Sequence, residues 1–318
     1  MTAPVFDVLT MGRVGVDLYP ERTGVPLDQV DRFHRYLGGS ATNVAVAAAR
    51  YGRRSAVITR TGDDPFGRYV HTALRGFGVD DRYVTAVPHL PTPVVFCEVF
   101  PPDDFPIYFY RYPKAPDLEI HDAELDLDAI RAAGVFSVTG TGLSAEPSRS
   151  STLHALEHRG RRDHTVVDLD YRPMFWPSRD EAGEVYAAAL DHASVAVGNL
   201  DEVEVAVGTR DPDEAARRLL DRGVRLAVVK QGPKGVLACT AGERVEVAPL
   251  PVHVVNGLGA GDAFGGALCH GLLAGWGLER LMRFCNAAGA IVTSRLACAD
   301  AMPAADEVEA LLAEDGAP

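Results

Sequence analysis

Short apolar runs alternate with amphipathic segments through most of the chain. The runs are rich in valine, alanine and leucine and predict strands, at 5–10, 56–59, 134–138, 165–169, 195–198, 226–230, 235–240 and 244–247. The segments between them predict helices, near 40–50, 65–77, 148–158, 180–191, 201–207, 212–222, 261–274, 278–295 and 304–313. This alternation predicts an α/β fold with a central, mostly parallel sheet flanked by helices.

One region departs from this alternation. Residues 94–100 and 107–112 read as two strands joined by the proline-rich segment 101–106, with no helix between them. A hairpin of this kind predicts a small β extension outside the main sheet.

An arginine lies in the second strand of this hairpin. Arg111 follows Tyr110 and stands among three tyrosines, which also include Tyr108 and Tyr112. Two interpretations remain open: aromatic rings packed on a cation, or an arginine that faces a substrate from a lid.

Composition places the chain among ordinary globular proteins. It has 318 residues, 47% of them hydrophobic and 24% charged, and this length suits one large α/β domain or two small ones. Of these we expect a single domain over 1–318. No apolar run approaches the length needed to span a bilayer, and the N-terminus lacks a signal-peptide pattern. The five cysteines form no Cys-x-x-Cys pair, which predicts reduced thiols and a cytoplasmic location.

The chain is acidic, with a formal net charge of −13. This charge argues against nucleic acid or an anionic membrane surface as a partner. It does not exclude small anionic ligands, because salt screens charges more than about 8 Å away.

A glycine-rich turn precedes one predicted helix. Gly257, Gly259 and Gly261 fall within five residues, just before an apolar helical run. Glycine accepts positive φ without steric cost, and a turn that opens a helix directs free N–H groups at one point. This pattern predicts an anion site, and Asp262 is a candidate base beside the anion. The alternative is that Asp262 only caps the helix and the glycines only pack.

Other polar residues lie at helix starts or strand ends, where ligands of open α/β sheets bind. Asn43 is in the first turn of an otherwise apolar helix, so it forms either a buried hydrogen bond or a ligand contact. Pro173 disfavours helix at Arg172, which leaves this guanidinium on a loop. Asn199 and Glu202 suit either an ordinary helix cap or a hydrated Mg²⁺.

Two further motifs compete with these. The segment 140–145 matches a dinucleotide-binding pattern, with Asp168 at the end of the following strand. His154 and His158 match a zinc-protease spacing, but Gly160 ends the helix just beyond them. A P-loop motif is absent from the sequence.

Several stretches together resemble one family, the ribokinase-like (PfkB-type) sugar kinases. Residues 37–43 resemble the first signature of the family and residues 256–264 the second. Further matching stretches follow the family's order, at 62–67, 199–202, 230–232 and 286–289. The resemblance covers essentially the whole chain.

The resemblance implies a central sheet with a β lid formed by about 12–36 and 91–114. It implies transfer of the ATP γ-phosphoryl group to a sugar hydroxyl. Asp262 would be the catalytic base, and the amides of Gly259, Ala260 and Gly261 would hold the charge that develops on the phosphoryl group.

The other roles implied by the resemblance fall into three sets. Sugar hydroxyls would be bound by Asp17, Gly38, Gly39 and Asn43. The nucleotide would be bound by Asn199, Lys230, Gly232, Gly235 and Asn286. Glu202 would hold Mg²⁺, through water.

Within the family, the lid sequence resembles kinases of deoxy keto sugar acids. Tyr110, Arg111 and Arg172 would then meet the substrate carboxylate. The substrate expected is 5-dehydro-2-deoxy-D-gluconate of inositol catabolism. The alternatives are 2-keto-3-deoxygluconate, a neutral ketose, or a catalytically silent sugar-binding protein on the same fold.

The chain also departs from the family pattern. Asn256 stands where many relatives carry an aspartate that helps to bind a monovalent cation, and Leu258 replaces threonine or valine. Potassium activation is therefore left open. An exposed β lid often pairs between subunits, so we expect a homodimer through the lid.

Overall fold

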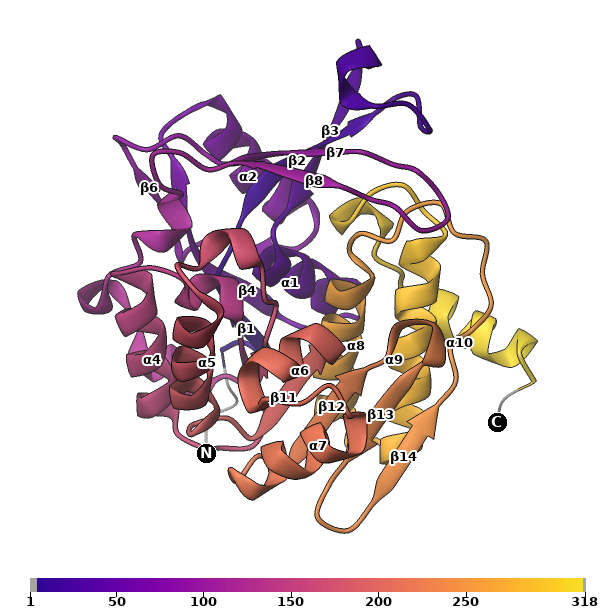
Figure 1. Cartoon of the computed structure of the whole chain (residues 1–318). Helices are drawn as coiled ribbons and strands as arrows, with labels where there is room; N and C mark the ends of the chain where they lie inside the picture. The colour runs from indigo at the N-terminus through magenta and orange to yellow at the C-terminus, as the bar shows by residue number, and fades with distance from the viewer. Residues whose placement is uncertain (1–4, 317–318) are drawn as a thin grey trace.

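The computed structural model describes residues 5–316 and forms a three-layer α/β structure with a smaller sheet above it (Figure 1). The main sheet runs in the order β14-β13-β12-β11-β10-β9-β1-β4-β5, and β6 also pairs with β4. Its strands are β1 (Val8–Met11), β4 (Ser55–Gly62), β5 (Val79–Asp80), β6 (Val84–Val87), β9 (Val135–Thr139), β10 (Thr165–Asp168), β11 (Val195–Asn199), β12 (Leu226–Lys230), β13 (Val236–Cys239) and β14 (Arg244–Val247). The pairs from β12 to β5 are parallel, whereas β13 and β14 are antiparallel additions at one edge.

Helices cover both faces of this sheet, and each face has its own hydrophobic core. One core is covered by α1 (Ser40–Arg50), α2 (Pro65–Gly76), α8 (Ala260–Ala274), α9 (Leu278–Thr293) and α10 (Ala305–Glu314). The other is covered by α3 (Leu127–Ala132), α4 (Ser148–Arg159), α5 (Arg179–Leu190), α6 (Leu200–Val207) and α7 (Pro212–Asp221). Strand residues alternate between the two cores, as expected for a sheet that is buried on both sides.

The smaller sheet is the lid. It has the order β3-β2-β7-β8 and consists of β2 (Gly15–Pro20), β3 (Phe33–Gly38), β7 (Val94–Cys97) and β8 (Ile107–Tyr110). A third hydrophobic cluster joins its Tyr19, Val95 and Cys97 to Cys298, which follows α9 in the chain. The lid therefore packs across the end of the main sheet at which α8 begins (Figure 1).

The predicted fold is confirmed, with local differences. The strands predicted at 94–100 and 107–112 end earlier, at Cys97 and Tyr110. Strands β2 and β3 lie in the lid segment of about 12–36 that the family resemblance implied, with β3 extending to Gly38, but the hydrophobic pattern did not mark them as strands. In β3 the exposed His34 and Arg35 are adjacent, so the alternation that marks a half-buried strand is lost. Among the described residues, no helix is both long enough and apolar enough to cross a membrane.

Candidate active site

The glycine turn before α8 has the geometry of an anion site. Gly259 has φ 84°, in the left-handed region, and a Cβ there would come within 2.9 Å of Cys298 Sγ. Helix α8 begins at Ala260, so the first N–H groups of this 15-residue helix have no partners within the helix. The positive end of the helix dipole lies behind these groups. The local structure thus favours a negative charge in front of Gly259 and Ala260.

Asp262 lies in the first turn of α8 and is tied to α1. Asn43 Nδ2 donates a hydrogen bond of 2.7 Å to Asp262 Oδ2. Burial raises the pKa of Asp262 to about 6 and the charge of Asp170 adds to this, while the Asn43 hydrogen bond opposes it. A carboxylate with this pKa is ionised at neutral pH but still basic enough to accept a proton.

A second carboxylate faces the same space. Asp17 comes from lid strand β2, and its side chain is buried. Burial raises the pKa of Asp17 to about 7, and the charge of Arg13 acts in the opposite direction. A Cβ at Gly38 would come within 2.2 Å of Asp17 Oδ1, so glycine is needed there to leave room for the carboxylate.

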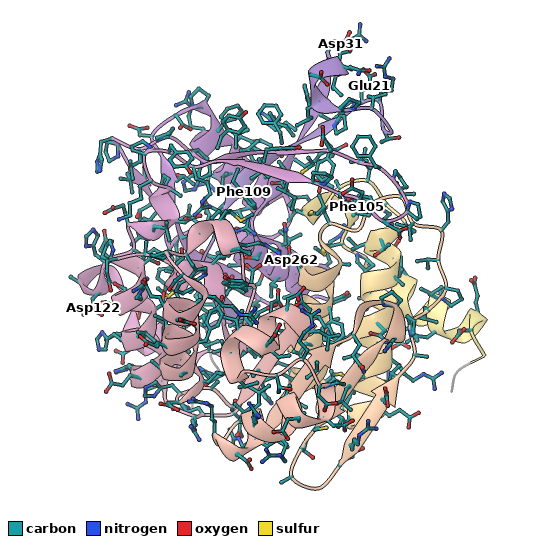
Figure 2. All side chains as sticks on the ribbon, viewed as in Figure 1. Glu21, Asp31, Phe105, Phe109, Asp122 and Asp262 are labelled. Carbon is teal, nitrogen blue, oxygen red and sulfur yellow. The ribbon has the colours of Figure 1, made fainter. Side chains whose placement is uncertain are left out.

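A small cavity of about 60 Å³ lies between the lid and the start of α8. Figure 2 shows Asp262 below the lid residues Phe105 and Phe109. The cavity is lined by Arg13, Asp17, Tyr19, Gly39, Asn43, Val95, Cys97, Ile107, Phe109, Arg172, Leu258, Gly259, Asp262 and Cys298. The lining therefore combines two carboxylates, two guanidinium groups and one amide on a largely apolar wall.

The structure brings most of the predicted sugar-binding residues into this cavity. Asp17, Gly39, Asn43 and Arg172 all line it, although they lie far apart in the sequence. Arg172 follows β10 and places Nη2 3.1 Å from Asp170 Oδ1.

Two predicted lid residues lie elsewhere. The ring of Tyr110 packs against Phe96, and the residue is 63% exposed. Arg111 is buried and pairs with Asp117, at 2.7 Å from Nη2 to Oδ1 and 3.2 Å from Nη1 to Oδ2. Neither residue is among the cavity-lining residues named above. The structure thus holds Arg111 in an internal ion pair with Asp117, and the ring nearest its guanidinium is that of Phe175. Tyr110 and Arg111 both line a separate, larger pocket of about 630 Å³ beside β8.

Arg13 lines the cavity and was missed in the sequence. It follows β1, at the carboxyl end of a parallel strand. The strand-end rule that directed attention to Asn199 and Arg172 applies equally to this position.

Lys230 lies next to the glycine turn, close to Gly261. A Cβ at Gly261 would be 3.4 Å from Lys230 Nζ, so the ammonium group is beside the first turn of α8. Burial disfavours its charge, but the carboxylates of Asp168 and Glu202 outweigh burial and raise the pKa of Lys230. A cation therefore adjoins the anion site.

Asn199 and Glu202 form a capping box at the start of α6. Asn199 Oδ1 accepts hydrogen bonds from the backbone N–H groups of Asp201 and Glu202, and Glu202 Oε2 accepts one from Asn199 N at 2.6 Å. Asn199 and Glu202 thus cap the start of α6, which was one of the two interpretations of their sequence pattern. Among residues 5–316, no three His, Cys, Asp or Glu side chains converge as a metal site.

A second cavity of about 350 Å³ adjoins β14 and α9. Asn286 lines it and donates hydrogen bonds to the carbonyls of Val247 and Ala248, at 3.3 and 3.1 Å. Gly235 has φ 92°, and a Cβ there would be 2.0 Å from Val247 O. Gly232 begins the turn that leads to Gly235. Asn286 and Gly235 thus both approach the end of β14 at Val247, and Gly232 lies in the preceding turn.

Asn256 is fully buried at the rim of the glycine turn. Its Nδ2 donates 2.6 Å to Leu296 O, and its Oδ1 accepts from Leu258 N at 3.1 Å. The Asn256 amide thus donates a hydrogen bond to the Leu296 carbonyl, and unlike the aspartate of many relatives it carries no negative charge.

A doubly wound sheet, a β lid and a glycine turn with an adjacent carboxylate define a ribokinase-like sugar-kinase fold. The sequence profile described as pfkB family carbohydrate kinase matches residues 5–305, and the chain belongs to that family. The family resemblance noted in the sequence is thereby confirmed.

Curated relatives and solved structures agree with this assignment. The chain is 32% identical to a 5-dehydro-2-deoxygluconokinase of Geobacillus kaustophilus, over 95% of this chain and 92% of the relative. It is also 32% identical to a protein of the same name from Halalkalibacterium halodurans, over 98% and 95%. A fructokinase of Vibrio cholerae, solved with fructose, ADP and potassium ion, has a TM-score of 0.83 at 26% identity and covers 98% of this chain and 100% of its own.

Proposed function

We propose that this protein transfers the γ-phosphoryl group of Mg·ATP to a hydroxyl group of 5-dehydro-2-deoxy-D-gluconate. The observation that carries the proposal is Asp262, held by Asn43 directly beside the glycine turn of α8. The names of the relatives at 32% identity supply the substrate. The cavity supports an acidic substrate, because Arg13 and Arg172 both line it.

In the proposed reaction, Asp262 accepts the proton of the attacking hydroxyl. The hydroxyl oxygen forms a bond to the γ-phosphorus, and the bond from that phosphorus to the β–γ bridging oxygen breaks. ADP leaves. The amides of the Gly259–Gly261 turn stabilise the charge on the transferred group, as preorganised donors do. Because this transition state is loose, positioning and electrostatics supply most of the catalysis.

We assign the second cavity to the nucleoside part of ATP. Asn286 lines it, and Gly235 packs against Val247, which also lines it. Gly232, in the turn before Gly235, and Lys230, beside Gly261, would approach the nucleotide from the side of the glycine turn. Lys230 would then neutralise phosphate oxygens next to Gly261. Asn199 would contribute through the start of α6, where its side chain caps the helix.

Mg²⁺ fits this arrangement through oxygen donors. Glu202 is buried next to Lys230 and Asp168. Mg²⁺ in kinases is held largely by phosphates and water, with one or two carboxylates. We therefore assign Glu202 to the ion through water. When bound, the ion would offset the negative charge of the phosphates.

Sugar hydroxyls are assigned to Asp17 and Asn43, with Gly38 and Gly39 allowing the close approach of the lid. A Cβ at Gly39 would be 2.4 Å from Arg13 O, so the chain cannot hold a side chain there without moving. The Oδ1 atom of Asn43 is buried without a hydrogen-bond partner among the described residues. A substrate hydroxyl would satisfy it.

We also propose that two copies of the chain pair through the lid. Strand β8 is an edge strand of the lid sheet, and its Tyr108 and Tyr110 are 46% and 63% exposed. Exposed, unpaired edges favour association. Sedimentation of the Tyr110→Lys variant should show a shift from dimer to monomer.

We further infer that the protein works in the cytoplasm. All five cysteines are free and buried, which suits a reducing compartment. Fractionation of cells that express the tagged chain would test this.

A coupled ATPase assay tests the activity. The panel is 5-dehydro-2-deoxy-D-gluconate, 2-keto-3-deoxygluconate, fructose and ribose. We expect the first to have the highest kcat/KM. Turnover of a neutral sugar alone would retain the kinase but overturn the sugar-acid assignment. Sugar binding without turnover would favour a silent binding protein.

A further inference from the structure

We propose that Arg13 is the residue that reads the substrate carboxylate, and that Arg111 supports the lid from behind. This inference rests on the proposed function, because it concerns specificity within that same site. It moves the carboxylate contact from the lid strand to the turn after β1.

Arg13 is a buried cation with no side-chain partner in the part of the chain that the structure describes. The residue is 9% exposed, and its Nε atom is buried with no hydrogen bond. Among residues 5–316, none of its three side-chain nitrogens forms a hydrogen bond or an ion pair. A buried charge costs free energy unless it is paired. An unpaired guanidinium that lines a cavity is therefore a site that a bound anion would complete.

Neighbouring residues in the described part of the chain hold Arg13 in place but accept no hydrogen bond from its guanidinium group. Its guanidinium carbon lies 5.5 Å from the centre of the Phe109 ring. Its backbone carbonyl accepts a hydrogen bond from Thr42 Oγ1 at 3.2 Å. The charges of Asp17 and Asp262 are near enough for Arg13 to lower their pKa values, but neither carboxylate forms an ion pair with it. Arg13 is thus fixed in the cavity wall with its donors unused.

Arg172, whose guanidinium also lines the cavity, differs from Arg13 because it has an ion-pair partner. It already has Asp170 as an ion-pair partner, at 3.1 Å. A neutral sugar would leave Arg13 unpaired in the closed site, whereas a carboxylate offers two oxygens to the planar guanidinium fork. The carboxylate of a sugar acid therefore matches the group that the protein leaves unpaired.

Arg111 provides the internal comparison. Both oxygens of Asp117 accept hydrogen bonds from its guanidinium, and Oδ2 also accepts one from Val14 N at 3.1 Å. The guanidinium carbon of Arg111 lies 4.7 Å from the centre of the Phe175 ring, and the Phe109 and Phe175 rings are 4.8 Å apart. Phe109 contacts Arg13 on one side of this pair and Phe175 contacts Arg111 on the other. Arg111 is therefore a positioning residue that acts through Asp117 on the chain next to Arg13.

The test compares two substrates and three variants. The substrates are 5-dehydro-2-deoxy-D-gluconate and its analogue in which the carboxylate is reduced to a hydroxymethyl group. For Arg13→Gln we expect the KM for the acid to rise about 10- to 100-fold, the loss typical of a charge-assisted pair. The KM for the analogue and for ATP should stay near the wild-type values. Arg13→Lys keeps the charge but loses the fork, so its KM for the acid should rise less.

The controls separate this inference from the proposed function. The wild type must first prefer the acid over the analogue; if it does not, the sugar-acid assignment is wrong. If the wild type prefers the acid and Arg13→Gln keeps that preference, the role given to Arg13 is overturned. Equal losses on both substrates would also overturn it, because they would show that Arg13 only balances nearby carboxylates.

Arg111→Gln is the matched arginine control. It should lower thermal stability and change the KM values for the two substrates by the same factor. A selective loss for the acid in Arg111→Gln would return the carboxylate role to the lid. If Arg13→Gln fails to fold, calorimetric titration of Arg13→Lys with the acid and the analogue in the absence of ATP decides the same question.

Discussion

The cavity under the lid and the ion pair behind it use the same kinds of residue in opposite ways. In the cavity, Asn43 Oδ1, Arg13 Nε and Arg172 Nε are buried without partners among the described residues. Behind the Phe109–Phe175 pair, the guanidinium of Arg111 donates two hydrogen bonds to Asp117, of 2.7 and 3.2 Å. Phe109 of the aromatic pair lies against Arg13, and Phe175 lies against Arg111.

This contrast separates binding from support. Buried polar groups are normally hydrogen-bonded, so several unpaired ones around one cavity call for an explanation. A ligand with hydroxyl and carboxylate groups provides one. The complete pairing of Arg111 needs no ligand, and its carboxylate partner also holds Val14 N beside Arg13. The residues around the cavity are thus suited to bind a substrate, and the Arg111–Asp117 pair is suited to stabilise the structure around that cavity.

The variant expected to act most strongly is Asp262→Asn in the cavity. It keeps the shape of the side chain but removes the base, so kcat should fall about 10²- to 10⁴-fold. Stopped-time phosphorylation assays measure the loss, and calorimetry should show sugar binding retained. Turnover near the wild-type rate would contradict the mechanism.

Behind the lid, the expected effect is on stability. Asp117→Ala leaves the buried guanidinium of Arg111 without a partner, which costs about 3–5 kcal/mol of unfolding free energy. Urea titration followed by circular dichroism measures this. Arg217→Gln breaks an exposed pair on α7 and serves as the control, with an unchanged midpoint expected. Equal midpoints for the two variants would remove the structural role.

A pH profile sharpens the role of Asp262. Because its pKa is raised to about 6 and the base must be ionised, kcat/KM should be highest above that value and fall tenfold per unit as the pH drops below it. Asn43→Ala removes a hydrogen bond that lowers this pKa, so the acid limb should move to higher pH. Asp17 titrates near 7, and Asp17→Asn shows its share of the limb. A limb that stays in place in Asn43→Ala would contradict the assignment.

The smallest effect concerns monovalent cations. The amide of Asn256 already donates to Leu296 O, so replacing potassium with tetramethylammonium should leave the rate unchanged within assay error. Asn256→Asp introduces the carboxylate and should create a dependence on potassium. Strong activation of the wild type would show that this rim binds a cation without a carboxylate.

Much of the architecture was predictable because it depends on local pattern. The alternating apolar runs predicted the main sheet, and the glycine spacing predicted the turn before α8, since both reflect the preferences of neighbouring residues. The family resemblance implied a β lid over about 12–36, but the pattern did not show strand β3 because Arg35 and His34 are both exposed and break the alternation. The absence of a period-two pattern there does not prevent pairing with β2, which is a long-range contact.

By itself, the sequence determined the fold class, the family, the glycine-rich turn and the carboxylate residue, Asp262, that follows this turn. Only the tertiary structure decided which arginine faces the cavity. Strand β8 ends at Tyr110, so strand alternation no longer fixes the direction of Arg111, and the buried carboxylate of Asp117 captures it instead. The same packing places Arg13 in the cavity wall, with no side-chain partner among residues 5–316. Pairing between distant charged groups depends on which surfaces meet, and one-dimensional spacing does not encode this.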